Sequence, residues 1–98
     1  MIKKQVYSDD DIVLNLVYFA EQKVCFIHSD VKKWSLSKYK KYLLIFSEIL
    51  NQLHKEGIDE LFAVPPTEKE EKWQSMFGFT DTGHEIDGYK VMGIKYGN

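Results

Sequence analysis

A long amphipathic stretch between two short apolar segments constrains the fold of this chain more than any other feature. Apolar side chains recur at helical spacing at Tyr39, Leu43, Phe46, Leu50 and Leu53, with Tyr42, Ile45 and Ile49 beside them. We predict a helix that is capped by Ser37 and ends at Gly57. The apolar segments Val24–His28 and Leu61–Val64 flank this helix and predict buried strands. Strands joined through a helix are expected to lie parallel, with a right-handed crossover.

Two strands are predicted on either side of the polar turn Ser8–Asp11, which precedes the strand–helix–strand unit. Residues Ile2–Tyr7 alternate weakly and are interpreted as a short edge strand. The run Ile12–Phe19 is rich in β-branched and aromatic residues, which favours a strand. A helix is the alternative for this run, because Ser8 can cap it and Asp9–Asp11 would lie in its first turn.

A short helix is predicted near the C-terminal end. Thr67 and Glu70 have the spacing of a capping box, in which each residue satisfies a free backbone N–H of the other. One apolar stripe is formed by Trp73, Met76 and Phe77. Gly78 is the expected left-handed residue after the helix. We predict that Trp73, Phe77 and the following Phe79 pack into the core.

The chain ends with a predicted β-hairpin. Asp87-Gly88 is a strong signal for a two-residue turn, and it joins the strand segments Phe79–Ile86 and Tyr89–Tyr96. A hairpin adds antiparallel strands to the parallel pair already predicted. The expected fold class is therefore α+β, with a mixed β-sheet and two helices.

Composition limits the classes of protein that fit. The chain has 98 residues, 44% of them hydrophobic, which predicts one folded domain over residues 1–98. The net charge of −2 indicates neither a nucleic-acid nor a membrane partner. All basic residues are lysines, so the planar bidentate contacts that arginine makes with phosphate are missing. The sequence shows no signal peptide and no long apolar run, which predicts a soluble, cytoplasmic protein.

Metal-binding patterns are not expected. Cys25 is the one cysteine, which excludes an intrachain disulfide and a cysteine-based zinc site. It is interpreted as a small core residue, with a catalytic thiol as the alternative. His28, His54 and His84 lie far apart in the sequence and lack the spacing of metal ligands.

A short helix closed by Gly78-Phe79 and followed by a hairpin resembles the last third of the GNAT superfamily of acyl-CoA N-acyltransferases. The predicted order of strand, strand, long helix, strand, short helix, strand, strand is the order of GNAT domains from their third strand onward. The resemblance covers residues Val13–Tyr96. It implies a GNAT-like fold truncated at its N-terminus, with acetyl-CoA as the cofactor of an active member.

The connection Ser29–Ser35 lies where the GNAT resemblance implies a glycine-containing loop. In that family the backbone N–H groups of the loop bind the CoA pyrophosphate. Here Ser35 takes the Arg/Gln position of the motif, and Lys38 and Lys40 take the glycine positions. With Ser37 at the helix start, these are the candidate cofactor-binding residues. The alternative is a solvated lysine face on an amphipathic helix.

The resemblance also implies where catalytic groups would lie. Family members often carry an Asn near the start of the short helix and an acidic Tyr four residues before the Gly of Gly-Phe. Thr67 and Gln74 hold these positions, and a glutamine cannot protonate a CoA thiolate. Ser75 is the neighbouring hydroxyl. His28, at the end of a central strand, is the candidate base, with a hydrogen-bonded structural role as the alternative.

Two functions fit these observations. The first is a catalytically silent GNAT-like protein that binds protein partners or takes part in assembly. Small proteins of this kind resemble GNAT-like proteins of tailed bacteriophages, including virion and head-assembly proteins, which would place the chain in the host cytoplasm or the virion. The second is an active N-acetyltransferase that uses acetyl-CoA to modify a small amine or a protein amine. We favour the first, because both the glycine loop and the acid are missing.

Overall fold

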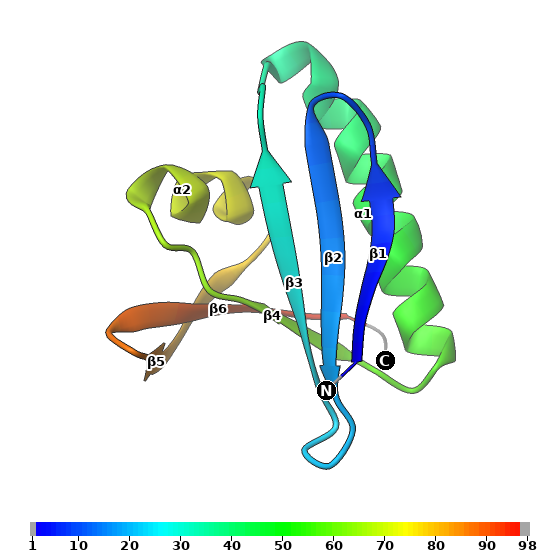
Figure 1. The fold of residues 1–98 in the computed structure, drawn as a ribbon, viewed down its shortest axis with the longest axis vertical. Helices are drawn as coiled ribbons and strands as arrows, with labels where there is room; N and C mark the ends of the chain where they lie inside the picture. Colours follow the sequence, from blue (N-terminus) through cyan, green and yellow to red (C-terminus); the bar gives the residue numbers. More distant parts are fainter. Residues whose placement is uncertain (1, 97–98) are drawn as a thin grey trace.

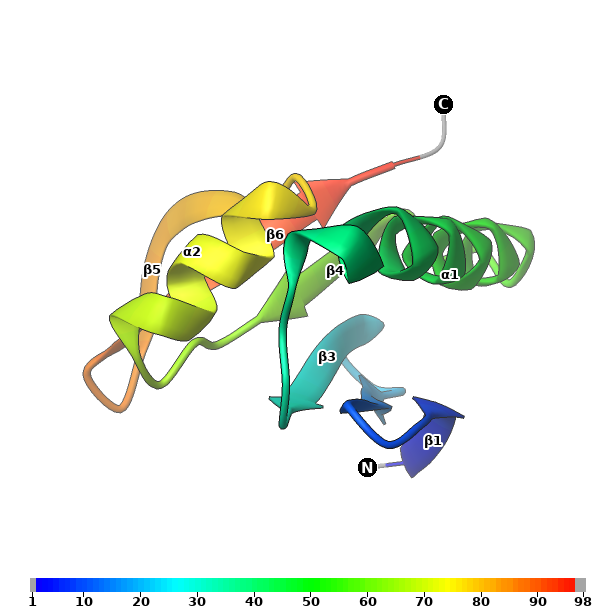
Figure 2. The ribbon, with the colours of Figure 1, turned by 90° about the horizontal axis from the view of Figure 1, so that it is seen from above.

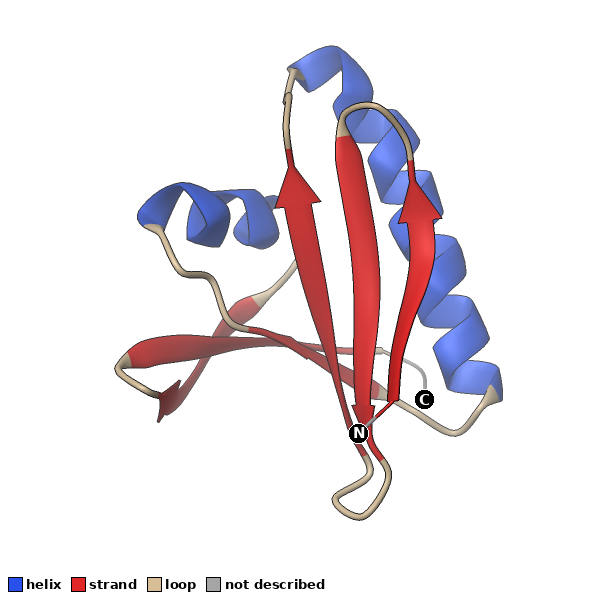
Figure 3. Cartoon of the chain, in the orientation of Figure 1, coloured by secondary structure: helices blue, strands red, loops and turns tan. Residues whose placement is uncertain are grey.

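The structure, a computed structural model, describes residues 2–96. It contains one mixed β-sheet and two helices (Figures 1 and 3). The strands are β1 (Ile2–Ser8), β2 (Ile12–Phe19), β3 (Val24–Val31), β4 (Glu60–Ala63), β5 (Thr80–Ile86) and β6 (Tyr89–Lys95). The helices are α1 (Leu36–Lys55) and α2 (Glu68–Met76). The strand order across the sheet is β1-β2-β3-β4-β6-β5. The predicted α+β class and the predicted order of elements are confirmed.

The N-terminal part of the sheet is a three-stranded antiparallel meander. Strand β2 pairs with β3 along its whole length, from Ile12 opposite Val31 to Phe19 opposite Val24. The helix considered for Ile12–Phe19 is therefore wrong, and the strand is confirmed. Strand β1 is the edge strand that was predicted. Strand β3 continues to Val31, so part of the predicted connection after His28 belongs to the sheet.

Strands β3 and β4 are parallel, and α1 crosses between them, as predicted. Within the described residues their ladder contains Cys25 opposite Leu61 and Phe26 opposite Phe62. Beyond this point the two strands diverge, and α2 lies in the angle between them (Figure 1). Divergence leaves a region of the sheet that side chains from the helices must fill.

Helix α1 begins two residues earlier than predicted. Ser35 is its N-cap, with extended backbone angles, so the assignment of Ser37 as the cap is wrong. The helix ends as predicted before Gly57, whose φ of 85° suits glycine. Its buried side chains are Tyr42, Phe46 and Leu53. Leu43, expected in this stripe, is 37% exposed, because the helix is rotated so that Tyr42 faces the core.

Helix α2 has the predicted ends. The Thr67 side chain accepts a hydrogen bond from the Glu70 N–H at 3.2 Å, and Gly78 has a φ of 99°. Phe77 and Phe79 are buried, and Trp73 is partly buried against the core, as predicted. Met76 is 38% exposed and Gln74 is 4% exposed, so the predicted place of Met76 in the apolar stripe is wrong. The buried face of α2 is centred on positions 73, 74 and 77.

Both helices pack on one face of the sheet (Figure 2). One core cluster joins β2 and β3 residues such as Leu14 and Ile27 to Phe46 of α1 and to Phe77. The opposite face carries Val17, Phe26 and other side chains that do not belong to this cluster. The hairpin turn is also as predicted, since Asp87 and Gly88 have φ values of 53° and 84°.

Gly93 lies in β6 between β4 and β5. An added Cβ atom would lie 2.9 Å from Thr82 Cγ2 and 3.3 Å from Phe62 Cδ1. We expect Gly93→Ala to lower the free energy of unfolding by about 1–3 kcal/mol, because the methyl group overpacks this contact. Urea unfolding measures the change.

Thr82→Ser is the matched partner of this substitution. It removes the Thr82 methyl group and keeps the hydroxyl that donates to the Val91 carbonyl at 2.8 Å. The double variant Gly93→Ala/Thr82→Ser should recover part of the lost stability. A double variant whose loss equals the sum of the two single losses would contradict the assigned contact.

Candidate functional site

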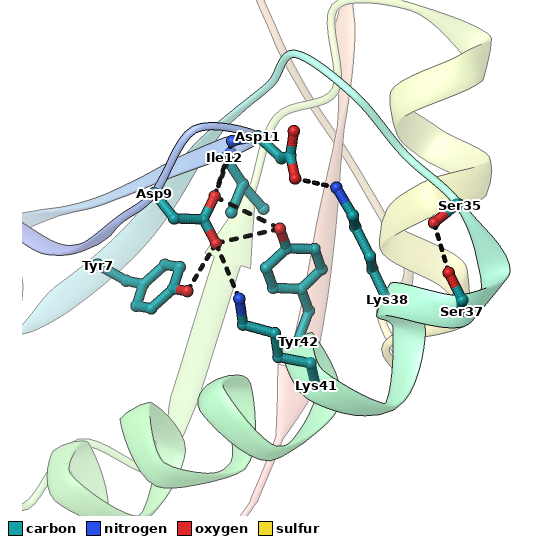
Figure 4. A network of polar contacts seen from close by, with 9 residues as sticks. All are labelled: Tyr7, Asp9, Asp11, Ile12, Ser35, Ser37, Lys38, Lys41 and Tyr42. Atoms are coloured by element: carbon teal, nitrogen blue, oxygen red, sulfur yellow. Dashed lines mark hydrogen bonds and ion pairs between the residues drawn. The ribbon is translucent and has the colours of Figure 1, made fainter.

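Two acidic residues of the β1–β2 turn face the N-terminal part of helix α1, and this junction is the candidate functional site (Figure 4). It adjoins the end of β3, where residues 32–35 lead into α1. Ligands of open sheets are commonly bound at such strand ends. The candidate cofactor-binding residues from the sequence all lie in this region.

The Asp9 carboxylate organises the turn. Its Oδ1 accepts hydrogen bonds from the backbone N–H groups of Asp11 at 2.8 Å and Ile12 at 3.0 Å, as in an Asx turn. Its Oδ2 accepts a hydrogen bond from the Tyr7 hydroxyl at 2.6 Å. This bond from Tyr7 is the main reason that the pKa of Asp9 lies well below its ordinary value of 3.8. Asp9 is therefore ionised at neutral pH.

Helix α1 supplies two further partners of Asp9. The Tyr42 hydroxyl donates to Oδ2 at 3.2 Å, and Lys41 Nζ lies 3.4 Å from the same oxygen (Figure 4). Burial of Tyr42, together with its hydrogen bond to Asp9, raises the pKa of Tyr42 to about 12. Hydrogen bonds with Tyr7 and Asp9 raise the pKa of Lys41. None of these three side chains therefore gains or loses a proton near neutral pH. Groups with such pKa values are poorly suited to general acid–base catalysis.

Asp11 holds one candidate cofactor-binding lysine and the first residues of the β3–α1 connection. Its carboxylate forms an ion pair with Lys38 Nζ. Its backbone carbonyl accepts hydrogen bonds from the N–H groups of Lys32 at 2.7 Å and Lys33 at 3.4 Å. A loop that binds pyrophosphate directs free N–H groups at the ligand. The N–H groups of Lys32 and Lys33 precede Ser35, the first position that the resemblance assigns to such a loop. Within that loop, the group that Asp11 takes up is the Lys38 side chain.

The four candidate cofactor-binding residues do not form one converging set. The Ser35 side chain makes no capping hydrogen bond, and its Oγ lies 3.0 Å from Ser37 Oγ. Figure 4 shows Lys38 directed toward Asp11 and the two serines directed toward each other. Lys40 is exposed. Only Lys38 therefore belongs to the polar network of the junction.

The two candidate catalytic residues lie on opposite faces of the sheet. His28 is exposed and lies opposite Asn15, on the face that alternates with buried Ile27. Ser75 is exposed on α2, which packs on the helix-bearing face. The Ser75 hydroxyl donates to the Glu71 carbonyl at 2.9 Å, a bond within the helix. His28 and Ser75 are not brought together.

Gln74, at the position implied for the acid, lies inside the protein. It is 4% exposed and lines a small cavity between α2, α1 and the strands β2 and β3. A buried amide at this position supplies no acid. Thr67 at the start of α2 serves as its N-cap.

Aromatic side chains pack beside the diverging strands. Trp34, from the β3–α1 connection, stacks on Tyr42 with ring centroids 5.8 Å apart and meets Trp73 edge-on at 5.8 Å. Trp73 in turn lies 4.7 Å from Phe77. This packing ties the β3–α1 connection to α2 and leaves a cavity of about 20 Å³ beneath α2.

Comparison of the chain with protein-family models, curated proteins and solved structures finds no match. Within residues 2–96, no cluster of His, Cys, Asp or Glu is placed to hold a metal ion. In the same part of the chain, no helix has the apolar length needed to cross a bilayer.

Sequence reasoning assigned no functional role to Asp9, Asp11 or Tyr42. The run Ser8–Asp11 was interpreted as a polar turn, and Tyr42 as part of an apolar stripe. The one local signal was an Asp three residues before the first strand residue, Ile12, which is the spacing of an Asx turn. Nothing local indicated which helix residues the carboxylates contact.

Proposed function

We propose that this chain is a GNAT-like protein without catalytic activity that acts through protein binding or assembly. The observation that carries the proposal is the ion pair of Asp11 with Lys38, which takes a glycine position of the implied loop. A pyrophosphate that approached Lys38 would have to displace the Asp11 carboxylate, which the chain itself supplies. Acetyl-CoA is therefore not expected to be a working cofactor.

The GNAT-like part of the proposal is supported by topology. A V-shaped divergence of two central parallel strands is a feature of that family, and β3 and β4 diverge after Cys25–Leu61 and Phe26–Phe62. The helix that ends at Gly78-Phe79 and the hairpin after it have the order that the resemblance implies. Fold likeness by itself carries no activity.

A protein-binding role is supported by the sheet face opposite the two helices. Val17 lies opposite Phe26, and Phe26 lies beside Phe62. The ring centroids of Phe19 and Phe26 are 5.9 Å apart, and those of Phe26 and Phe62 are 5.7 Å apart. These rings are only partly buried and lie outside the core cluster. A contiguous apolar face of this kind suits contact with the apolar surface of a protein partner.

The setting that we propose for this role is assembly of a bacteriophage virion or head. It rests on the resemblance of small GNAT-like chains with a degraded phosphate loop to proteins of tailed phages. In that setting the partner is another protein of the assembly, and acetyl transfer has no part. The alternative function is acetyl-CoA-dependent N-acetyl transfer, and the binding experiment below distinguishes it from the proposed one.

Titration calorimetry with acetyl-CoA at about physiological salt tests the proposal. We expect no saturable binding in the low micromolar range, because lysines without aligned N–H groups supply charge without geometry. The Asp11→Asn variant is the informative comparison, since it frees Lys38 and leaves the Asp11 carbonyl in place. Any binding that it gains should be weak and should decline as salt increases.

Tight binding by the unmodified chain, together with turnover of an amine acceptor, would contradict the proposal. Lys38→Ala and Lys40→Ala should then weaken binding, and His28→Ala would test the base. In that event the chain would be an active acyltransferase with a divergent loop.

A further inference from the structure

Helix α1 exposes leucines on the side that faces away from the sheet (Figure 2). Leu44 is 71% exposed, and Leu36, one residue from the helix start, is 78% exposed. Leu44 lies two residues from each of the buried Tyr42 and Phe46, so the helix repeat places it on the opposite, outer side. Exposed aliphatic side chains on one helix are candidates for contact with a partner.

Two charged residues flank Leu44 at equal distances along the helix. Lys40 precedes it by four residues and Glu48 follows it by four, and both side chains are exposed. Neighbours that can pair along a helix lie three or four residues away, and at these positions Lys40 and Glu48 have only uncharged residues. The ion pairs formed within residues 2–96 include neither of them. Both charges are therefore available to a partner.

A second copy of the same helix has the complementary arrangement. Lys40, Leu44 and Glu48 form one ridge of an i, i+4 row, and the commonest packing of two helices aligns such rows at a crossing angle of about 50°. A two-fold axis beside Leu44 makes the two rows run in opposite directions. Lys40 of each copy then lies beside Glu48 of the other. Ser47, beside Leu44, donates its hydroxyl to the Leu43 carbonyl at 2.9 Å, so its burial in the contact leaves no unpaired donor.

We propose that the outer side of α1 is a homodimer contact, in which a second copy of this chain packs across Leu44. The charges identify the occupant, because a lysine and a glutamate at equal distances from one leucine complement their own copies in a two-fold contact. One helix from each copy makes a contact smaller than the standard interface of about 1,600 Å², so the dimer is weak and exchanges with monomer. This surface lies on the helix-bearing side of the sheet, so the inference goes beyond the proposed function and does not depend on it.

Sedimentation equilibrium of the whole chain tests the contact over concentrations from about 10 μM to 1 mM, the range in which a weak dimer forms. The unmodified chain should shift from monomer to dimer across this range. Lys40→Glu and Glu48→Lys should each raise the dissociation constant about tenfold or more, because each replaces two attractive contacts with two repulsive ones. Lys69→Glu is the matched control, since it makes the same charge change at an exposed position of α2 and should leave the dissociation constant unchanged.

A mixture of the Lys40→Glu and Glu48→Lys chains gives the sharpest measurement. In their heterodimer the two introduced residues face each other, and the unchanged Lys40 faces the unchanged Glu48. The mixture should therefore dimerise nearly as tightly as the unmodified chain, although each variant alone does not. An unmodified chain that stays monomeric throughout, or a dimer that the two variants do not weaken, would overturn the proposal. Weakening without recovery in the mixture would overturn it as well, because the two charges would then not face each other.

Discussion

Phe77→Ala is expected to lower the free energy of unfolding by about 3–5 kcal/mol, the range for truncating a buried aromatic residue. Phe77 is 6% exposed, and its ring lies 4.7 Å from Trp73, 5.4 Å from Tyr39 and 5.6 Å from Phe46. Removing the ring opens a cavity where α1, α2 and the sheet meet. Equilibrium unfolding in urea, followed by tryptophan fluorescence and by circular dichroism, measures the loss.

Met76→Ala is the matched control, because Met76 is the preceding residue and is 38% exposed. It should change stability far less than Phe77→Ala does. Trp73→Ala should fall between them, because Trp73 is partly buried. Equal losses of unfolding free energy in Phe77→Ala and Met76→Ala would contradict the described packing of α2 on the sheet.

Asp9→Asn is expected to lower the urea midpoint at about pH 7, with a smaller effect at low pH. The folded-state pKa of Asp9 is depressed, chiefly by the hydrogen bond from Tyr7, while the unfolded chain has the ordinary value of 3.8. A depressed carboxyl pKa stabilises the fold fully above the unfolded value. This contribution is lost as the pH falls below 3.8 toward the folded pKa. Asparagine can still accept the two turn hydrogen bonds through Oδ1, but its amide nitrogen replaces the Oδ2 that accepts from Tyr7 and Tyr42. The variant therefore removes the charge together with these two hydrogen bonds, and the dependence of the midpoint on pH identifies the part due to the charge.

Asp10→Asn is the control for this experiment, since Asp10 is the exposed neighbour in the same turn. It should leave the midpoint and its dependence on pH nearly unchanged. The gap between the unmodified chain and Asp9→Asn should narrow as the pH is lowered through the acid range. A gap that stays constant with pH would show that the Asp9 charge does not stabilise the fold.

Several elements of this protein could be predicted because their signals are local. Thr67 and Glu70 cap a helix through a hydrogen bond between residues three apart, and Asp87-Gly88 forms a turn through its own backbone angles. The β-branched and aromatic residues of Ile12–Phe19 favoured a strand, with a helix left as the alternative, and the pairing of β2 with β3 confirmed the strand. These signals depend on neighbouring residues, so they act in the same way in any fold that contains them.

The rotation of the helices on the sheet was not predictable in the same way. Gln74 is buried and Met76 is partly exposed, although hydrophobicity favours the reverse. The helix repeat places positions 73 and 77 on one face, and position 74 lies beside them. Contact with the aromatic side chains beside β3 decided that this face turns inward.

By itself, the sequence determined the order of strands and helices, their ends at Thr67, Gly57 and Asp87-Gly88, and the parallel pairing around α1. Only the tertiary structure decided the candidate site. Asp9 meets Tyr42 across 33 residues of chain, and Asp11 meets Lys38 across 27. Both contacts exist because crossover of α1 carries its first turns over the β1–β2 turn, and no local pattern specifies that meeting. Long-range hydrogen bonds and ion pairs follow from how packed elements are placed, whereas caps and turns follow from adjacent residues.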